Sequence, residues 1–121
     1  MRELIERMDR KSTGDSSHWF EEGLRSGSIK VKNAKYEIDK SGDLIWKDGT
    51  WVKGTWQSGL WKNGTWEKGT WRNGVWKDGT WRDGYWKNGT WKNGTWEDGT
   101  WSHGIWKKGT WLKGKGKPRN A

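Results

Sequence analysis

Cysteine is absent from this 121-residue sequence, and most of the usual core-forming residues are scarce. Without thiols, neither a disulfide framework nor a thiolate metal site is possible, which fits a reducing compartment. The chain holds one Phe, two Tyr, two Met and one Pro, and only 29% of its residues are apolar. Hydropathy alone would place such a composition among disordered chains.

Long apolar runs are also missing. No stretch approaches the roughly 18 residues of a membrane-spanning helix. The first residues, Met1 to Arg7, lack the apolar region of a signal peptide. We therefore expect a soluble protein that is made in the cytoplasm and has no membrane partner.

Tryptophan makes up for the missing apolar residues. The chain has 15 Trp and 19 Gly, and one Trp can bury about 150–250 Å². From residue 46 onward Trp recurs at every fifth position without interruption, and Gly follows three residues after each Trp. We predict that these tryptophans form the core: Trp46, Trp51, Trp56, Trp61, Trp66, Trp71, Trp76, Trp81, Trp86, Trp91, Trp96, Trp101, Trp106 and Trp111.

Each five-residue unit combines a β-forming pair with a turn. The residue before Trp is mostly Thr or another residue that favours β-structure, and the residue before Gly is usually Asn, Asp or Lys. We expect the turn glycines to need either a positive φ or the absence of a side chain. The turn glycines include Gly49, Gly64, Gly79 and Gly94. A repeat at a constant period is typical of repeat architectures.

Two β architectures suit this unit, since a glycine at every fifth residue excludes a helix. Asn63-Gly64, between Trp61 and Trp66, favours an antiparallel β-meander of hairpins that resemble designed tryptophan zippers. Hairpins with two-residue turns need an even number of residues per strand, however, and a five-residue unit leaves an odd number. We therefore predict a mainly β chain containing a short Trp-lined β-solenoid, with one pentapeptide on each side of a coil. The meander is the alternative.

The array at residues 46–114 resembles the pentapeptide-repeat family. In that family a bulky apolar residue and a small residue two positions earlier both point inward, and Trp51 and Gly49 take these places here. The resemblance implies a four-sided, right-handed β-helix, although Trp is larger than the Leu or Phe usual in the family. The sequence itself leaves the number of sides open. Non-Thr residues at positions 45, 60, 75 and 105 suit three sides, whereas those at positions 45, 85 and 105 suit four.

The segment before the array, residues 1–45, predicts a small α/β cap or attachment segment. Residues 1–27 suit short helices, and Ser16 or Ser17 is placed to cap the second of them. One face of that second helix carries three apolar residues, Trp19, Phe20 and Leu24.

Residues 28–45 predict two strands. Apolar residues alternate with charged ones on either side of Asn33-Ala34. Ser41-Gly42-Asp43 then predicts a turn just before the first repeat.

The formal net charge of +9 is distributed unevenly over the cap, the array and a tail at residues 115–121 that we expect to be disordered. The cap is neutral, the array carries +6 and the tail +3. This excess favours an anionic partner such as a nucleic acid, bound weakly and without sequence specificity. A solvated basic surface that keeps the protein in solution is the simpler interpretation. The candidate polyanion-binding residues are Lys87, Lys92, Lys107, Lys115, Lys117 and Arg119.

No catalytic pattern is visible. The two histidines, His18 and His103, lie in polar contexts typical of a solvated surface. Several aspartates precede a glycine of the array, but Lys, Ser, His or Asn takes the same position in other repeats. This substitution pattern indicates a turn role rather than a calcium site. We therefore predict no enzymatic activity, no metal site and no cofactor.

A structural or assembly module is the function that these features favour. Tryptophan-glycine pentapeptide arrays also resemble uncharacterised proteins of tailed phages, which implies a virion or accessory role and a location in the virion. The alternatives are binding of a nucleic acid or other polyanion by the basic repeat surface, and carbohydrate binding by exposed Trp. We expect a protein partner or self-association, because Leu112 and the lysine-glycine stretch after it offer little cover for the far end of a solenoid.

Overall fold

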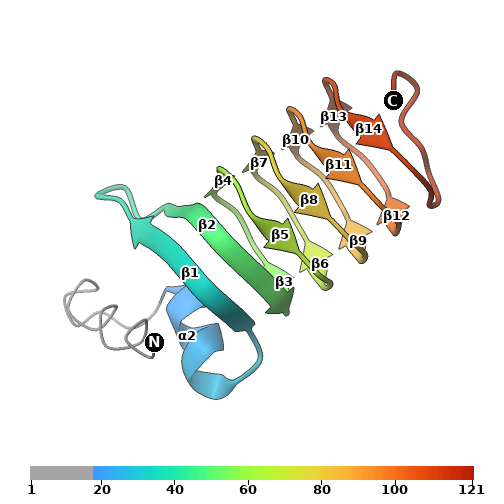
Figure 1. The fold of residues 1–121 in the computed structure, drawn as a ribbon. Coiled ribbons are helices and arrows are strands. Elements are labelled where there is room, and N and C mark those ends of the chain that lie inside the picture. Colours follow the sequence, from blue (N-terminus) through green and yellow to red (C-terminus); the bar gives the residue numbers. More distant parts are fainter. Residues whose placement is uncertain (1–17) are drawn as a thin grey trace.

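The computed structural model describes residues 18–121, so the first predicted helix lies outside the described residues. The described chain is mainly β. It forms a rod of stacked coils, with helix α2 (Trp19–Ser26) and strand β1 (Lys30–Ile38) at one end and the C-terminus at the other (Figure 1).

Every repeat of the array contributes a strand that contains its Trp. Strand β2 (Leu44–Lys53) is longer and covers the first two repeats. The later repeats form two-residue strands: β3 (Thr55–Trp56), β4 (Leu60–Trp61), β5 (Thr65–Trp66), β6 (Thr70–Trp71), β7 (Val75–Trp76), β8 (Thr80–Trp81), β9 (Tyr85–Trp86), β10 (Thr90–Trp91), β11 (Thr95–Trp96), β12 (Thr100–Trp101), β13 (Ile105–Trp106) and β14 (Thr110–Trp111).

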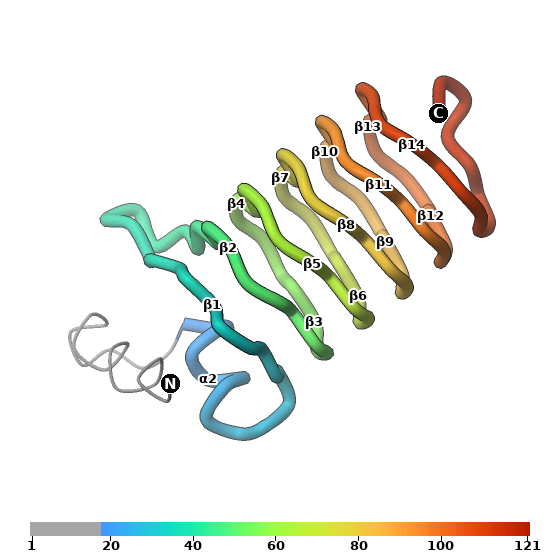
Figure 2. Tube along the Cα trace, viewed as in Figure 1, coloured from blue at the N-terminus to red at the C-terminus, as the bar shows by residue number. Residues whose placement is uncertain are grey.

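Three repeats make one coil. Parallel pairing places each repeat beside the repeat 15 residues earlier, as in the register of Trp61 with Trp76. The first side follows the order β2-β4-β7-β10-β13, the second β2-β5-β8-β11-β14 and the third β3-β6-β9-β12. Fourteen repeats thus form four complete coils and two further sides (Figure 2). The predicted β-solenoid is confirmed, and the parallel pairing is incompatible with the antiparallel meander.

The four-sided cross-section that the family resemblance implied is wrong, and the size and shape of indole supply the reason. Successive rings along the chain meet edge to face, with centroids 5.6–5.9 Å apart and planes inclined by 64–72°. Aromatic pairs favour this geometry. Three such rings fill the interior of one coil, and the tryptophans of the inner coils are fully buried.

Between coils, the indoles form three continuous stacks. Each ring lies over the ring 15 residues earlier, with centroids 4.6–4.9 Å apart and planes within 4–7° of parallel. Thirteen of the fourteen array tryptophans are buried, from Trp46 to Trp106, while Trp111 in the last coil is partly buried. The core of the described chain is therefore a column of aromatic contacts rather than an aliphatic interior.

Glycine forms the corner between two sides. Gly79 has a φ of +123°, and a β-carbon added to it would lie 2.3 Å from the carbonyl oxygen of Gly64 in the preceding coil. Both reasons that we predicted for glycine, a positive φ and the lack of room, hold at this corner. Asn63 is not among the described residues with positive φ, so Asn63-Gly64 is not a type I′ hairpin turn.

Backbone hydrogen bonds repeat from coil to coil around these corners. Side chains add to them at some corners only: the indole N–H finds a carbonyl acceptor at three array tryptophans, whereas eight other buried indole N–H groups have no acceptor in the described chain. The amide of Lys77 donates to the carbonyl of Trp61 at 2.7 Å. The indole N–H of Trp61 donates to the carbonyl of Asp78 at 3.2 Å, and the carboxylate of Asp78 accepts from the amide of Gly79 at 2.9 Å. Each aspartate of this kind orders its own corner, which agrees with a turn role for these residues.

Helix α2 covers the first coil. His18, rather than Ser16 or Ser17, is its N-cap, because the His18 Nδ1 accepts from the amide of Phe20 at 3.0 Å. Phe20 is fully buried and stacks on Trp51 with ring centroids 5.9 Å apart. Trp19 meets Trp56 edge to face at 5.6 Å. The predicted apolar face of this helix thus closes the end of the indole stacks.

Strand β1 is a single bent strand rather than the two strands that we predicted. It pairs antiparallel with β2, whose own path turns the corner between two sides of the solenoid. Register shifts occur between Lys32 and Lys35, and Asn33 between them has a φ of +51°. A bulge there lets β1 follow the corner without ending, because an extra residue bends the strand.

The last seven residues lie against the final coil. The amide of Lys115 donates to the carbonyl of Gly99, and its own carbonyl accepts from the amide of Trp101, both at 2.9 Å. The side-chain amide of Asn120 donates to the carbonyl of Trp106. Although composition predicts disorder here, the tail follows the third side and reaches the first.

The burial of the indoles leads to a spectroscopic prediction. We expect tryptophan emission at short wavelength and weak quenching by acrylamide in the native protein, because thirteen of the fifteen Trp are buried. Unfolding in guanidinium chloride should shift the emission to the red and raise the quenching constant several-fold. Red-shifted, strongly quenched emission from the native protein would contradict the indole-filled core.

Candidate functional site

The histidines have structural contacts in the described residues. His18 caps α2, and its other ring nitrogen lies 3.2 Å from the carbonyl oxygen of Gly42. His103 lies on the surface with its Nδ1 2.8 Å from the Ser102 hydroxyl. Within residues 18–121, no group of three potential metal ligands occurs, and no helix has the length and apolar character to cross a bilayer. The candidate sites are therefore the outer surfaces of the rod.

Corners that join the same two sides stack along the rod, and each such column of corners forms one of its three edges. One of these edges carries a continuous row of lysines. In all five repeats of the first side, the residue that follows Trp is Lys, and parallel register places these residues one above another. All five are exposed. We name this row the lysine ladder: Lys47, Lys62, Lys77, Lys92 and Lys107.

The positive charge of the array is segregated among the three edges. The edge between the first and second sides holds the lysine ladder, Lys108 and two aspartates, and carries +4. The edge between the third and first sides carries +2, from Arg72 and Lys87. The edge between the second and third sides, here the balanced edge, has four basic and four acidic residues and no net charge: Lys53, Glu67, Lys68, Arg82, Asp83, Glu97, Asp98 and Lys113.

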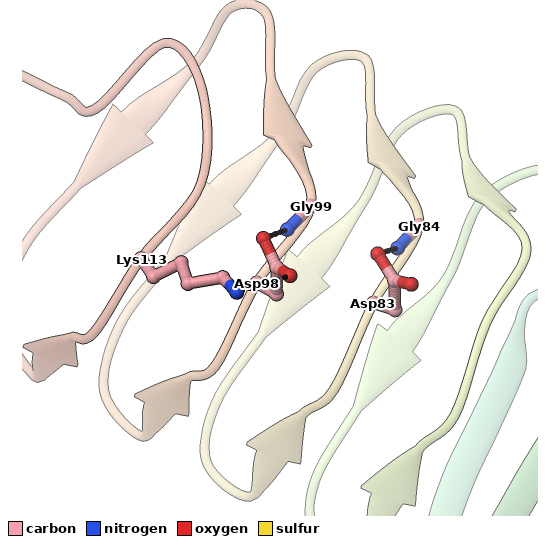
Figure 3. Close-up of polar contacts among 5 residues, drawn as sticks. All are labelled: Asp83, Gly84, Asp98, Gly99 and Lys113. Carbon is pink, nitrogen blue, oxygen red and sulfur yellow. Dashed lines mark hydrogen bonds and ion pairs between the residues drawn. The ribbon is translucent and has the colours of Figure 1, made fainter.

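Ion pairs link charges along the balanced edge. Lys113 lies 3.5 Å from Asp98, whose other oxygen accepts from the amide of Gly99 (Figure 3). Arg82 lies 3.5 Å from Glu97. In contrast, Lys47 is the one ladder residue with an ion pair in the described chain, to Glu37 at 2.9 Å.

The predicted polyanion-binding residues fall on three different surfaces. Lys92 and Lys107 belong to the lysine ladder, Lys87 lies on the neighbouring +2 edge, and Lys115, Lys117 and Arg119 lie at the far end of the rod. Sequence reasoning missed Lys47, Lys62 and Lys77. The signal that would have found them is the recurrence of Trp-Lys at every third repeat, a 15-residue period.

The two ends of the rod differ. α2 and β1 cover the first coil, whereas β13 and β14 are the outermost strands of the last one. Apolar side chains are exposed there, with Ile105 57% and Leu112 61% accessible. The basic tail crosses part of this end, and no described strand pairs with the outer edge of β14.

A carbohydrate platform would need exposed indoles. Thirteen of the array tryptophans are buried, and Trp111, the remaining one, is partly buried against the core cluster. The described surface therefore offers no row of Trp faces on which sugar rings could stack.

Comparisons with known proteins found no matching protein family, no matching curated protein and no matching solved structure. The description of this chain as a three-sided, Trp-lined solenoid accordingly rests on its own geometry.

Proposed function

We propose that this protein is a structural assembly module that associates through the end formed by its last coil. The observation that supports this function is the difference between the two ends. One end is closed by aromatic contacts of Trp19 and Phe20, and the other presents the unpaired edge of β14 and exposed apolar side chains. Open strand edges favour pairing with another chain.

The covered first coil restricts the geometry of self-association. Head-to-tail stacking would need the last coil of one copy to meet the first coil of the next, and α2 and β1 occupy that surface. Two last coils can meet through a two-fold axis, which gives a closed dimer instead of a filament. The same end could dock on a larger assembly, and a place in a phage virion rests on the sequence resemblance alone.

Electrostatics should oppose this dimer at low salt. Lys107, Lys108, Lys113 and the basic tail all lie at the last coil, so a two-fold contact brings cations together. Salt screens such repulsion. We therefore expect association to strengthen as the salt concentration rises.

Sedimentation velocity tests this function. Over a range of about 5–100 μM protein, we expect a monomer–dimer equilibrium that shifts toward dimer when salt is raised from about 0.05 to 0.5 M. Replacing Ile105 and Leu112 together by Ser should weaken dimerisation several-fold. Tyr85→Ser is the matched control, because Tyr85 is 39% exposed in the middle of the third side.

Two results would contradict the proposal of self-association. The first is a strict monomer at the highest protein and salt concentrations. The second is a series of ever larger oligomers, which would indicate head-to-tail stacking.

A further inference from the structure

The lysine ladder places like charges in a row at the spacing of a β-sheet. The rings beneath successive ladder residues are 4.6–4.9 Å apart, from Trp46 through Trp61 and Trp76 to Trp106. Five lysines therefore extend over about 19 Å at the usual strand spacing. Within the described residues, none of the four ladder lysines after Lys47 has an ion pair.

The surroundings of the ladder add few negative charges. Asp48 and Asp78 are the two acidic array residues on this edge, and each carboxylate accepts a hydrogen bond from the amide of the next glycine. Elsewhere in the array, acidic residues lie on the balanced edge. A ligand with a row of negative groups would relieve the repulsion along the ladder and would meet little repulsion of its own.

We propose that the lysine ladder binds the phosphate backbone of double-stranded nucleic acid aligned with the axis of the solenoid. A duplex turns once in about 34 Å, so about 19 Å of ladder spans roughly half a turn, along which the winding phosphate backbones of both strands pass the row of lysines. Lysine contacts to phosphate carry no sequence information, and binding is independent of sequence. This interaction is separate from the association at the last coil.

The structure favours a duplex over a single strand. Proteins that bind single strands combine a basic groove with aromatic faces on which bases stack. The array tryptophans of the first side are buried beneath the ladder. The outward residues next to the ladder are Ile45, Leu60, Val75, Thr90 and Ile105, none of them aromatic.

A lipid surface fits the same face less well. Membrane-surface binding depends on apolar side chains that enter the bilayer as well as on basic residues. Ile45, Leu60 and Val75 are partly buried between neighbouring coils, and Ile105 alone in this column is largely exposed. The linear arrangement of charge therefore indicates a linear polyanion.

The test compares two triple variants with equal net charge. In the ladder variant, Lys62, Lys77 and Lys92 are replaced by Gln. In the control variant, Lys53, Lys68 and Arg82 on the balanced edge are replaced by Gln. All six side chains are at least partly exposed, so both variants should keep the melting temperature of the wild type.

The measurement is fluorescence anisotropy of a labelled 20-bp duplex of arbitrary sequence, titrated at several salt concentrations. The slope of log K against log salt changes by about 0.9 for each phosphate that the protein no longer neutralises. We expect the ladder variant to flatten the slope by about 2.7 and to bind on the order of 100-fold more weakly near 0.1 M salt. The control variant should stay within about threefold of the wild type.

Three outcomes would overturn the proposal. Equal losses of affinity in the two variants would show that only net charge matters. Tighter binding of the matching single strand than of the duplex would contradict a backbone site without stacking. Binding of the wild type to phosphatidylserine vesicles that the ladder variant abolishes, without any weakening of duplex binding, would assign the ladder to a lipid surface.

Discussion

Replacing Trp76 by Ala should destabilise the protein by at least about 3 kcal/mol. Trp76 is fully buried and stacks between Trp61 and Trp91, with ring centroids 4.6 and 4.8 Å away. The substitution also removes its edge-to-face packing on Trp71 and Trp81. The cavity would lie at the centre of the rod, where three stacks of rings meet and the backbone corners leave little freedom to collapse.

Chemical denaturation monitored by far-UV circular dichroism would measure this destabilisation, since fluorescence itself changes with the number of Trp. Trp111→Ala is the matched control. Trp111 stacks on one ring, Trp96, and is partly exposed. We expect Trp111→Ala to lower the free energy of unfolding by less than half as much as Trp76→Ala does. A destabilisation below about 1 kcal/mol for Trp76→Ala would exclude the interpretation that the indoles hold successive coils together.

Gly79→Ala should destabilise the protein by more than about 2 kcal/mol, well above the difference in propensity between the two residues. Two independent effects combine at this corner. A φ of +123° is strained for any L-residue with a side chain, and the added methyl group would lie 2.3 Å from the Gly64 carbonyl oxygen. Removing the clash with the carbonyl oxygen would require the two coils to move apart, which would weaken the indole stack between them.

The matched control separates these two effects. Gly42 has a positive φ of +88°, but a β-carbon there would have no heavy atom within 4 Å. Gly42→Ala should therefore show the conformational cost alone, about 1–2 kcal/mol. Equal decreases in melting temperature for the two variants would mean that the contact between coils adds nothing to the destabilisation at Gly79. An unchanged melting temperature for Gly79→Ala would show that this corner does not require glycine.

Local sequence features predicted the solenoid and its interior because they act within one repeat. The odd period is incompatible with regular two-residue hairpins. Trp is the one large apolar residue that every repeat contains, so it must form the core, and the glycine marks the corner where the chain turns. The apolar face of α2 was also readable, from Trp19, Phe20 and Leu24. The N-cap of α2 could not be predicted from the sequence, because three adjacent residues, Ser16, Ser17 and His18, can all accept a hydrogen bond from a helix amide.

The number of sides was decided by tertiary structure. A pentapeptide specifies one side and one corner, but the closure of a coil depends on how rings from different repeats pack across the interior. Indoles meet edge to face three to a coil, and this packing sets the 15-residue vertical register. That register in turn creates the lysine ladder, because residues such as Lys62 and Lys77 become neighbours only when the coil has three sides.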